Sequence, residues 1–240
     1  MPRTIFYLGG DSYPGEQDWE EALGGLLASD DVRFVRHPEF HRAWTVSSPP
    51  SIEERLAMVA EAVGRTSVDD EIFLIGRSSG ARIATLFAAR DPRVAAVVCL
   101  FYPFRAPGMR IEPGRFMHLA TLETPTLILQ GASDEYGGNA LTEDYELSEA
   151  IRLRFVPGDH QLRANSPSGR HLLKLIPAYI DGGWRDAGQN LAAFDEHFYL
   201  WAHPGIAEAV ADGRCPSGAQ HFQAAGRREG RKYRMRVETV

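Results

Sequence analysis

A serine between two glycines, at the junction of a strand and a helix, constrains this chain more than any other feature. Residues 76–80 read GRSSG; they follow the apolar run Glu71–Ile75 and precede the helical pattern Ala81–Ala89. Glycines two positions either side of Ser78 let strand and helix approach without a clash between Cβ atoms. The spacing predicts a tight, strained turn that exposes the Ser78 hydroxyl at the end of a sheet, above a helix N-terminus.

Strand-like and helix-like segments alternate along the first ~180 residues, which predicts an α/β fold with a mostly parallel sheet and helices on both faces. Most strand candidates are short apolar runs, as expected for strands buried on both faces. Ser51 and Glu54 form a capping box that opens a helix ended by Gly64. The predicted strands are Thr4–Leu8, Val32–Val35, Glu71–Ile75, Val94–Leu100, Thr126–Gln130 and Arg152–Val156, and the last predicted core helix is Leu172–Ile180.

The pattern changes after the glycines at positions 182, 183 and 188. Beyond them the chain contains two short helical stretches and no convincing strand. We therefore expect an α/β domain over residues 1–183 and a small all-helical C-terminal module over residues 190–232. The basic tail Arg227–Arg236 is interpreted as a solvated end, with binding of an anionic partner as the alternative. An aromatic group marks the start of the module: Phe194, Phe198, Tyr199 and Trp201.

Size and composition are those of an ordinary soluble globular protein, with 240 residues, 44% hydrophobic and 24% charged. No apolar run approaches the roughly 18 residues of a membrane span. The N-terminal residues resemble a strand and not a signal peptide, so we expect a cytoplasmic location. The net charge of −6 argues against general binding of nucleic acid. Arginine supplies nearly all of the 26 basic residues, which we attribute to a GC-rich bacterial genome.

Neither a cofactor nor a metal ion is expected. Cys99 and Cys215 are interpreted as free thiols, because two such cysteines do not make a disulfide framework. His37 and His41 could ligate a metal, but Pro38 disfavours a continuous helix that presents both rings. No glycine-rich phosphate loop or dinucleotide fingerprint follows a strand.

Nucleophilic catalysis by serine needs a base, and the base needs an orienting carboxylate; the chain supplies candidates for both after Ser78. Asp134 comes shortly after the strand Thr126–Gln130, and His160 comes shortly after Arg152–Val156. Both therefore lie beyond the carboxyl ends of strands, where open α/β sheets place their ligand sites. We expect the three side chains to meet at one rim of the sheet.

The chemistry follows from the residue types. A neutral hydroxyl such as that of Ser78 is a poor nucleophile, and His160 can accept its proton because imidazole titrates near pH 7. Asp134 would orient the ring and stabilise the imidazolium. Asp159 and Glu135 are weaker competitors for the acid role.

Backbone N–H groups are expected to stabilise the oxyanion. One belongs to Ser79, and the other to the loop after the first strand, at Gly9 or Gly10, where a plain tight turn is the alternative. Arg82 is expected to anchor a neighbouring loop, with binding of a substrate carboxylate as the alternative. The candidate pocket residues are Asp11, Arg77, Tyr102, Phe104, Met109 and Tyr136, and core packing is an equal alternative for Tyr102, Phe104 and Met109.

With these residues placed, the first ~180 positions resemble the small, lidless α/β-hydrolases related to dienelactone hydrolase, in particular the testis-expressed and chromatin-complex-associated type and its bacterial relatives. The resemblance implies hydrolysis of an ester or thioester by Ser78, Asp134 and His160, although some eukaryotic members look like complex subunits. Ser79 departs from the apolar residue of many relatives, and little effect is expected because its N–H is unchanged. The matching stretches are Gly9–Asp11, Gly76–Arg82, Tyr102–Phe104 with Pro107-Gly108, Pro125–Asp134 and Gly158–His160.

The C-terminal residues resemble helical modules appended to bacterial glycosyltransferases, methyltransferases and other polysaccharide-associated proteins. This resemblance implies a link to surface-glycan metabolism. The equal alternative is a packing module that covers the hydrolase or joins copies into a homo-oligomer. The matching stretches are Phe194–Pro204, Ile206–Val210, His221-Phe222 and Gly226–Arg231.

These features together predict a serine hydrolase that cleaves a carboxylic ester or thioester through an acyl-enzyme. An open site suits small or extended polar substrates, so a small metabolite or an acylated glycan is the expected partner. The alternative is a non-catalytic scaffold or binding protein of the same fold in a polysaccharide-related assembly.

Overall fold

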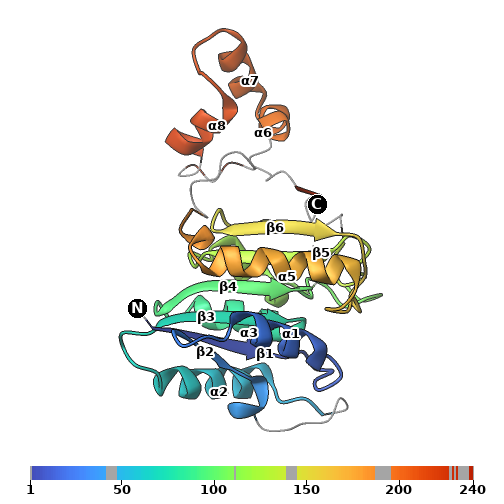
Figure 1. Cartoon of the computed structure of the whole chain (residues 1–240). Coiled ribbons are helices and arrows are strands. Elements are labelled where there is room, and N and C mark those ends of the chain that lie inside the picture. Colours follow the sequence, from blue (N-terminus) through green and yellow to red (C-terminus); the bar gives the residue numbers. More distant parts are fainter. Residues whose placement is uncertain are drawn as a thin grey trace. The chain divides into compact units, whose positions relative to one another are not determined.

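The computed structural model describes residues 2–41, 48–110, 112–138, 145–186 and 196–226, together with residues 229, 231, 238 and 239. The chain divides into two compact units. The first comprises Met1–Gly188 with Thr239–Val240, and the second comprises Gln189–Glu238. The first unit contains the sheet, apart from Glu238 of its last strand, and the helices that cover it (Figure 1).

The sheet has the strand order β2-β1-β3-β4-β5-β6-β7. Every pairing from β2 to β6 is parallel, which confirms the predicted α/β class. The predicted strands are all present and differ from the observed ones by at most two residues at an end. The bounds are β1 Arg3–Leu8, β2 Val32–Val35, β3 Glu71–Arg77, β4 Val94–Leu100, β5 Thr126–Gly131, β6 Ile151–Val156 and β7 Glu238–Thr239.

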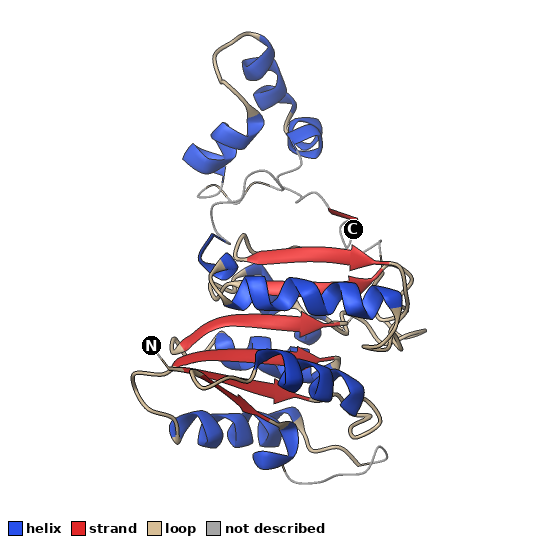
Figure 2. Ribbon diagram, in the orientation of Figure 1, coloured by secondary structure: helices blue, strands red, loops and turns tan. Residues whose placement is uncertain are grey.

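Helices cover both faces of the sheet (Figure 2). Ile5 and Tyr7 of β1 share one buried hydrophobic cluster with Trp19 of α1 and Leu172 of α5. Phe6 points to the opposite face, because successive side chains of a strand alternate. On that face α2 and α3 contact each other, and α3 packs on β1, β3 and β4. The helices are α1 Gln17–Leu27, α2 Ile52–Gly64, α3 Ser79–Ala88 and α5 Pro167–Ile180, with 3-10 helices η1 His37–Glu39, η2 Pro113–Arg115, η3 Met117–Ala120 and η4 Gly183–Asp186.

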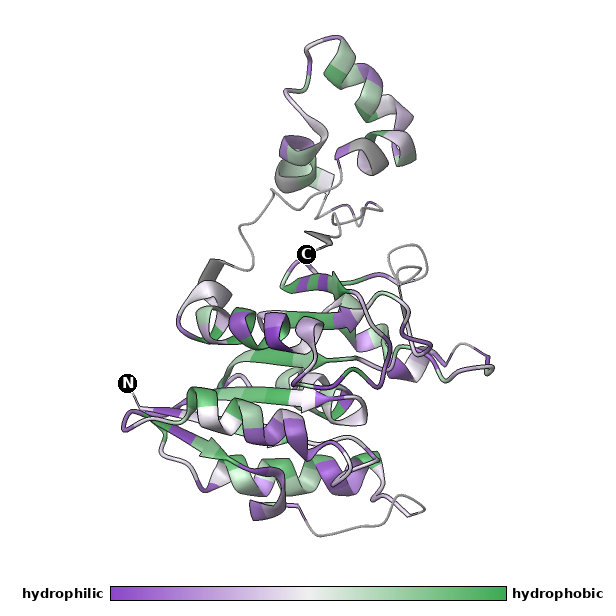
Figure 3. Ribbon diagram, turned by 45° about the vertical axis from the view of Figure 1, so that its right-hand side comes forward, coloured by the Kyte–Doolittle hydropathy of each residue, from purple (hydrophilic) through white to green (hydrophobic). Residues whose placement is uncertain are grey.

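Figure 3 shows why the strands could be found from the sequence: hydrophobic residues concentrate in the central strands, whereas the helices mix hydrophobic and hydrophilic residues. The predicted capping box is present, since Ser51 Oγ accepts from the Glu54 N–H at 3.2 Å and Glu54 Oε2 accepts from the Ser51 N–H at 2.8 Å. Helix α5 begins five residues before the predicted start, because Ser166 caps its first turn by accepting from the Gly169 N–H.

The second unit is helical over residues 196–226. Tyr199 is fully buried and packs with Phe222, Ile206 and Ala219, and its hydroxyl lies 3.0 Å from His221 Nδ1. Trp201 is exposed, while Phe194, the side chain of Phe198 and most of the basic tail lie outside the described residues. The elements are α6 Glu196–Ala202, α7 Pro204–Ala211, α8 Gly218–His221 and a π-helical turn at Phe222–Gly226. None of the helices described in either unit has the length and hydrophobicity needed to cross a bilayer.

Candidate active site

The turn at Ser78 has the strained geometry that its sequence predicts. Ser78 follows β3 and caps α3 with φ 52° and ψ −124°, a conformation that costs a non-glycine residue roughly 1–3 kcal/mol. A Cβ on Gly76 would lie 2.5 Å from Ala81 Cα, and a Cβ on Gly80 would lie 2.0 Å from the carbonyl oxygen of Leu8. Both glycines are therefore required by the close approach of strand, helix and the β1 loop.

Ser78, His160 and Asp134 form a continuous hydrogen-bonded chain. Ser78 Oγ lies 2.9 Å from His160 Nε2. His160 Nδ1 lies 2.9 Å from Asp134 Oδ2 and 3.1 Å from Oδ1. Asp134 and His160 are each 3% exposed, whereas Ser78 is half-buried and reachable from solvent. With the proton on Nδ1, the imidazole donates to the carboxylate and accepts from the hydroxyl, which is the arrangement that general-base activation needs.

The carboxylate of Asp134 is held by its own loop. Its Oδ1 accepts from the Tyr136 N–H at 2.8 Å, and its Oδ2 accepts from Gln130 Nε2 at 2.8 Å. Gln130 is fully buried at the end of β5. These bonds fix the direction of the carboxylate toward His160.

Neither competing acid is in contact with the His160 ring in the described part of the chain. Asp159 Oδ1 accepts from the backbone N–H of Gln161 at 2.9 Å, within its own turn. Glu135 is exposed. Asp134 is therefore the only one of the three carboxylates whose oxygens contact the His160 ring in the described structure.

Two aromatic rings enclose the imidazole of His160. The Tyr136 ring lies 4.1 Å from it between centroids at 32°, and the Phe101 ring lies 6.3 Å away at 71°. Tyr136 is half-buried beside the histidine, and its place at the edge of a substrate site stays a prediction. Gln130 and Phe101 were missed from the sequence, because their roles depend on contacts between separate loops.

Arg77 does not line an accessible pocket, which corrects the prediction for this residue. Its side chain is 3% exposed and forms an ion pair with Glu16, whose side chain is 7% exposed. Arg77 Nη2 also donates to the carbonyl oxygen of His160 at 2.6 Å. Arg77, held by Glu16, thus anchors the loop that carries His160. No local sequence motif indicated Glu16 as the partner of Arg77.

The backbone donors near Ser78 divide into engaged and available groups. The Ser78 N–H donates to the Leu100 carbonyl at 2.9 Å, and the Gly9 N–H donates to His37 Nδ1 at 3.1 Å. Gly9 is therefore not an available oxyanion donor, which corrects that prediction. Within the described residues the N–H groups of Ser79 and Gly10 have no acceptor, and a Cβ on Gly10 would lie 3.1 Å from the Ser78 Cβ.

The two histidines of the segment after β2 are structural. Burial lowers the pKa of His37 to about 2 and that of His41 to about 3, with the Arg55 charge contributing to both. The rings stack at 4.3 Å, and His41 Nδ1 lies 3.2 Å from Met58 Sδ. A neutral His37 can accept the Gly9 N–H, so this ring supports the loop that carries Gly10. No cluster of three metal-ligating side chains occurs among residues that the structure describes.

Tyr102 and Phe104 belong to the core, which decides between the two alternatives for them. Both are fully buried with ring centroids 4.7 Å apart, and the Tyr102 hydroxyl donates to the Arg115 carbonyl at 2.6 Å. Burial raises the pKa of Tyr102 well above its usual value.

Met109 is 65% exposed. Arg82 Nη2 donates to the Gly114 carbonyl at 3.1 Å, in agreement with an anchoring role.

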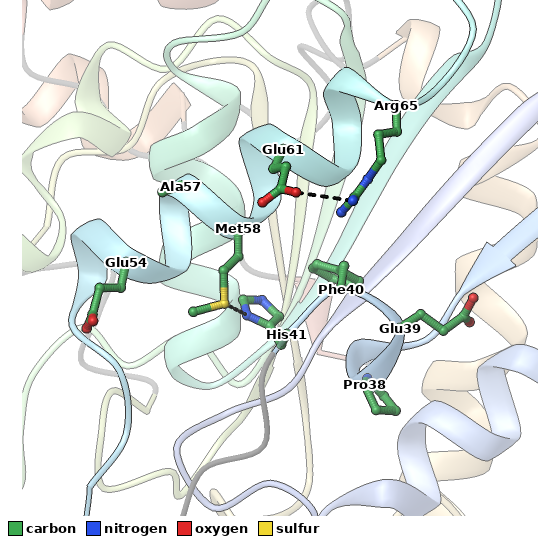
Figure 4. A pocket seen from close by; sticks show the side chains of 9 residues that line it. All are labelled: Pro38, Glu39, Phe40, His41, Glu54, Ala57, Met58, Glu61 and Arg65. Carbon is green, nitrogen blue, oxygen red and sulfur yellow. Dashed lines mark hydrogen bonds and ion pairs between the residues drawn. The ribbon is translucent and has the colours of Figure 1, made fainter.

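A separate surface groove of about 540 Å³ lies between η1 and α2 (Figure 4). Its apolar residues include Phe40 and Met58, and Glu61 on its rim pairs with Arg65 at 3.1 Å. No residue of the hydrogen-bonded chain at Ser78 lines it.

Comparison with known proteins finds a matching family. Residues 27–182 match the profile of a family described as "Alpha/beta hydrolase domain". No curated protein matches the chain in sequence.

Solved structures with a similar fold are found. The thioesterase domain from the curacin biosynthetic pathway has a TM-score of 0.57 and 14% identity, over 74% of this chain and 91% of that one. Est1E from Butyrivibrio proteoclasticus, with bound ferulic acid, has a TM-score of 0.56 and 15% identity, over 74% and 88%. A monoacylglycerol lipase of Paleococcus ferrophilus has a TM-score of 0.53 and 12% identity, over 75% and 95%. At these identities the likeness shows a shared fold.

Proposed function

Because the chain belongs to the alpha/beta hydrolase domain family, we propose that it is a serine hydrolase which cleaves a carboxylic ester or thioester through an acyl-enzyme. The observation that carries this proposal is the chain of contacts from Ser78 Oγ to His160 Nε2 at 2.9 Å and from His160 Nδ1 to Asp134 Oδ2 at 2.9 Å. Nucleophile, base and orienting acid are each within hydrogen-bonding reach of the next.

In the first half of the reaction Ser78 Oγ attacks the carbonyl carbon of the substrate while its proton passes to His160 Nε2. The N–H groups of Ser79 and Gly10 stabilise the oxyanion that forms. The tetrahedral intermediate collapses to an acyl-Ser78, and the departing alkoxide or thiolate takes the proton from His160.

In the second half a water molecule attacks the acyl carbon and gives its proton to His160 Nε2. Collapse of the second intermediate releases the carboxylic acid and returns the proton to Ser78 Oγ. Asp134 stabilises the imidazolium in both halves and keeps Nε2 directed at the serine.

For the substrate we propose a small acyl ester or thioester of a metabolite, or an O-acyl group on a glycan. Est1E with bound ferulic acid and the curacin thioesterase domain have the same fold, and their names connect that fold with ester and thioester chemistry. The glycan choice depends on the resemblance of the C-terminal residues to modules of polysaccharide-associated proteins. A relationship to the dienelactone-hydrolase type, a cytoplasmic location and a bacterial source are further parts of the proposal.

We also propose that residues 1–183 form the hydrolase domain and residues 190–232 a separate module. The division of the structure near residue 188 supports this arrangement. Self-association through the module, which would produce a homo-oligomer, remains a prediction.

The test is a panel of short-chain aryl esters, acyl thioesters and acetylated sugars, with matched variants of the three neighbouring carboxylates. Asp134→Asn should lower kcat by about 10⁴-fold, because it removes the charge that sets the histidine tautomer. Asp159→Asn and Glu135→Gln, which alter acids outside the hydrogen-bonded chain at Ser78, should stay within about twofold of wild type. Equal activity in all three variants would refute the assignment, and a folded protein inactive on every class would favour the scaffold alternative.

A further inference from the structure

A closed polar network joins three elements beside Ser78. Arg55 of α2 is 2% exposed, and its Nη2 donates to the carbonyl oxygen of Gly9 at 2.6 Å. Its Nη1 donates to Asp11 Oδ1 at 3.1 Å and to Ser79 Oγ at 2.8 Å. The Ser79 hydroxyl completes the ring by donating to the same Asp11 oxygen at 2.6 Å.

The network links the two available backbone donors. Gly10 lies between Gly9 and Asp11, and Arg55 binds both of these neighbours. Ser79, which carries the second N–H, is bound by Arg55 and by Asp11. The separation and direction of the two N–H groups therefore depend on contacts made by three side chains.

The charge of Arg55 makes the network strong. Burial lowers the pKa of Arg55 to about 10, with Asp11 acting in the opposite direction, so the guanidinium is cationic at neutral pH. Hydrogen bonds from a charged donor are about twice as strong as neutral ones. Removing a partner of a buried guanidinium also costs folding free energy, because a buried charge is left uncompensated. The Gly9–Asp11 loop is consequently held against the first turn of α3.

We propose that Arg55 is a positioning residue which, through Asp11 and the hydroxyl of Ser79, sets the geometry of the oxyanion hole formed by the Gly10 and Ser79 N–H groups. The inference rests on the proposed function. It gives the Ser79 side chain a role that an apolar residue at this position could not fill. We therefore expect loss of the Ser79 hydroxyl to lower activity, whereas the sequence alone predicted little effect of the residue type at position 79.

This role predicts a specific kinetic signature. Oxyanion donors act on charge that develops in the transition state, and removing one typically costs about 10²–10³ in rate. Misplacing such a group by about 1 Å can cost up to about 10²-fold. Loosening the network should therefore lower kcat while KM changes little.

The experiment compares Arg55→Met, Ser79→Ala, Asp11→Asn and the double variant of Ser79 and Asp11 with wild type. Ser79→Ala keeps the backbone N–H and alters a half-buried side chain. This variant should therefore fold, and it tests the inference if Arg55→Met unfolds the protein. Arg65→Met is the matched control, because Arg65 follows the same helix and its side chain is 63% exposed. The measurements are kcat and KM on an aryl ester, and the Kd of an alkyl boronic acid and of the carboxylate product.

We expect Ser79→Ala and Asp11→Asn each to lower kcat and weaken boronic acid binding by about 10-fold, with KM and product Kd within about twofold. The double variant should resemble the single ones, because both residues act in one network. Wild-type kcat and boronic acid affinity in both single variants would overturn the inference while leaving the proposed function intact. A folded wild-type protein that neither reacts with a fluorophosphonate nor binds the boronic acid would overturn the proposed function and the inference together.

Discussion

Arg77 and His160 are joined by a hydrogen bond of 2.6 Å from the arginine Nη2 to the histidine carbonyl oxygen. Because Arg77 also pairs with the buried Glu16, the residue before Ser78, the proposed nucleophile, is connected to the backbone of His160, the proposed base. The turn at Ser78 and the loop that carries His160 are therefore held together by a buried charge as well as by the Ser78–His160 contact.

Removing one partner of this pair should destabilise the fold strongly. Arg77→Met leaves the carboxylate of Glu16 buried without its cation, and we expect a loss of about 3–5 kcal/mol in the free energy of unfolding, measured in urea. Adding Glu16→Gln should restore part of the loss. Arg93→Met, which breaks the more exposed pair with Asp91, should cost no more than about 1 kcal/mol. Equal losses at Arg77 and Arg93 would contradict the role of the buried pair.

Gly80 should be intolerant of a side chain. Its added Cβ would meet the Leu8 oxygen at 2.0 Å and the Gly9 oxygen at 2.6 Å, both of them backbone atoms. Gly80→Ala should therefore push α3 away from the β1 loop, and we expect it to lower kcat by at least about 10-fold and to lower Tm.

Gly25→Ala is the matched control, because a Cβ on this helical glycine meets nothing within 4 Å. It should stabilise the protein by about 0.5–1 kcal/mol and leave kcat unchanged. The close approach would be disproved by a Gly80→Ala enzyme with the Tm and kcat of wild type.

The strained turn at Ser78 and the hydrogen-bonded chain from Ser78 to Asp134 were predictable because local patterns mark them. Ser78 lies between two glycines at a strand–helix junction, and Asp134 and His160 each follow a strand end. Helix α1 was not predicted, since Gly24 and Gly25 weaken its helical pattern.

Polar contacts between residues far apart in the sequence could not be predicted. Arg55 and Glu16 meet partners 44 and 61 positions away, and nothing near them in sequence indicates this pairing. The sequence also could not decide between pocket and core for Tyr102. Its position after a strand places it at the expected edge of the sheet, while its burial depends on the segment that covers it.

The buried histidines should make the fold acid-sensitive. An unfolded chain binds a proton at each ring near pH 6.5, whereas the folded pKa values of His37 and His41 are lowered to about 2 and about 3. The unfolded state binds more protons below pH 6.5, so folded stability falls as pH decreases, by about 1.4 kcal/mol per unit for each ring.

This slope is measured as the free energy of unfolding between pH 7 and pH 4. His37→Asn retains an acceptor for the Gly9 N–H and removes one titrating ring, so the variant should lose about 1.4 kcal/mol per pH unit less than wild type. An unchanged slope would show that the ring of His37 does not resist protonation in the fold.

Glu196 should stabilise the second unit without affecting hydrolysis. Its carboxylate accepts from the N–H groups of Gly218 and Ala219 at 2.6 and 2.7 Å. Glu196→Gln weakens these charge-assisted bonds, and hydrogen exchange of residues 218–221 should become about 10-fold faster. Unchanged exchange, or a matching fall in kcat, would contradict an independent module.

The most direct test is the mass of the intact protein after reaction with a fluorophosphonate, compared between wild type and Ser78→Ala. We expect one adduct per wild-type chain, located on Ser78, and none on the folded variant, with labelling slowed by at least about 10³-fold in His160→Ala. Equal labelling of wild type and Ser78→Ala, or no labelling of a folded wild-type protein, would contradict nucleophilic catalysis by Ser78.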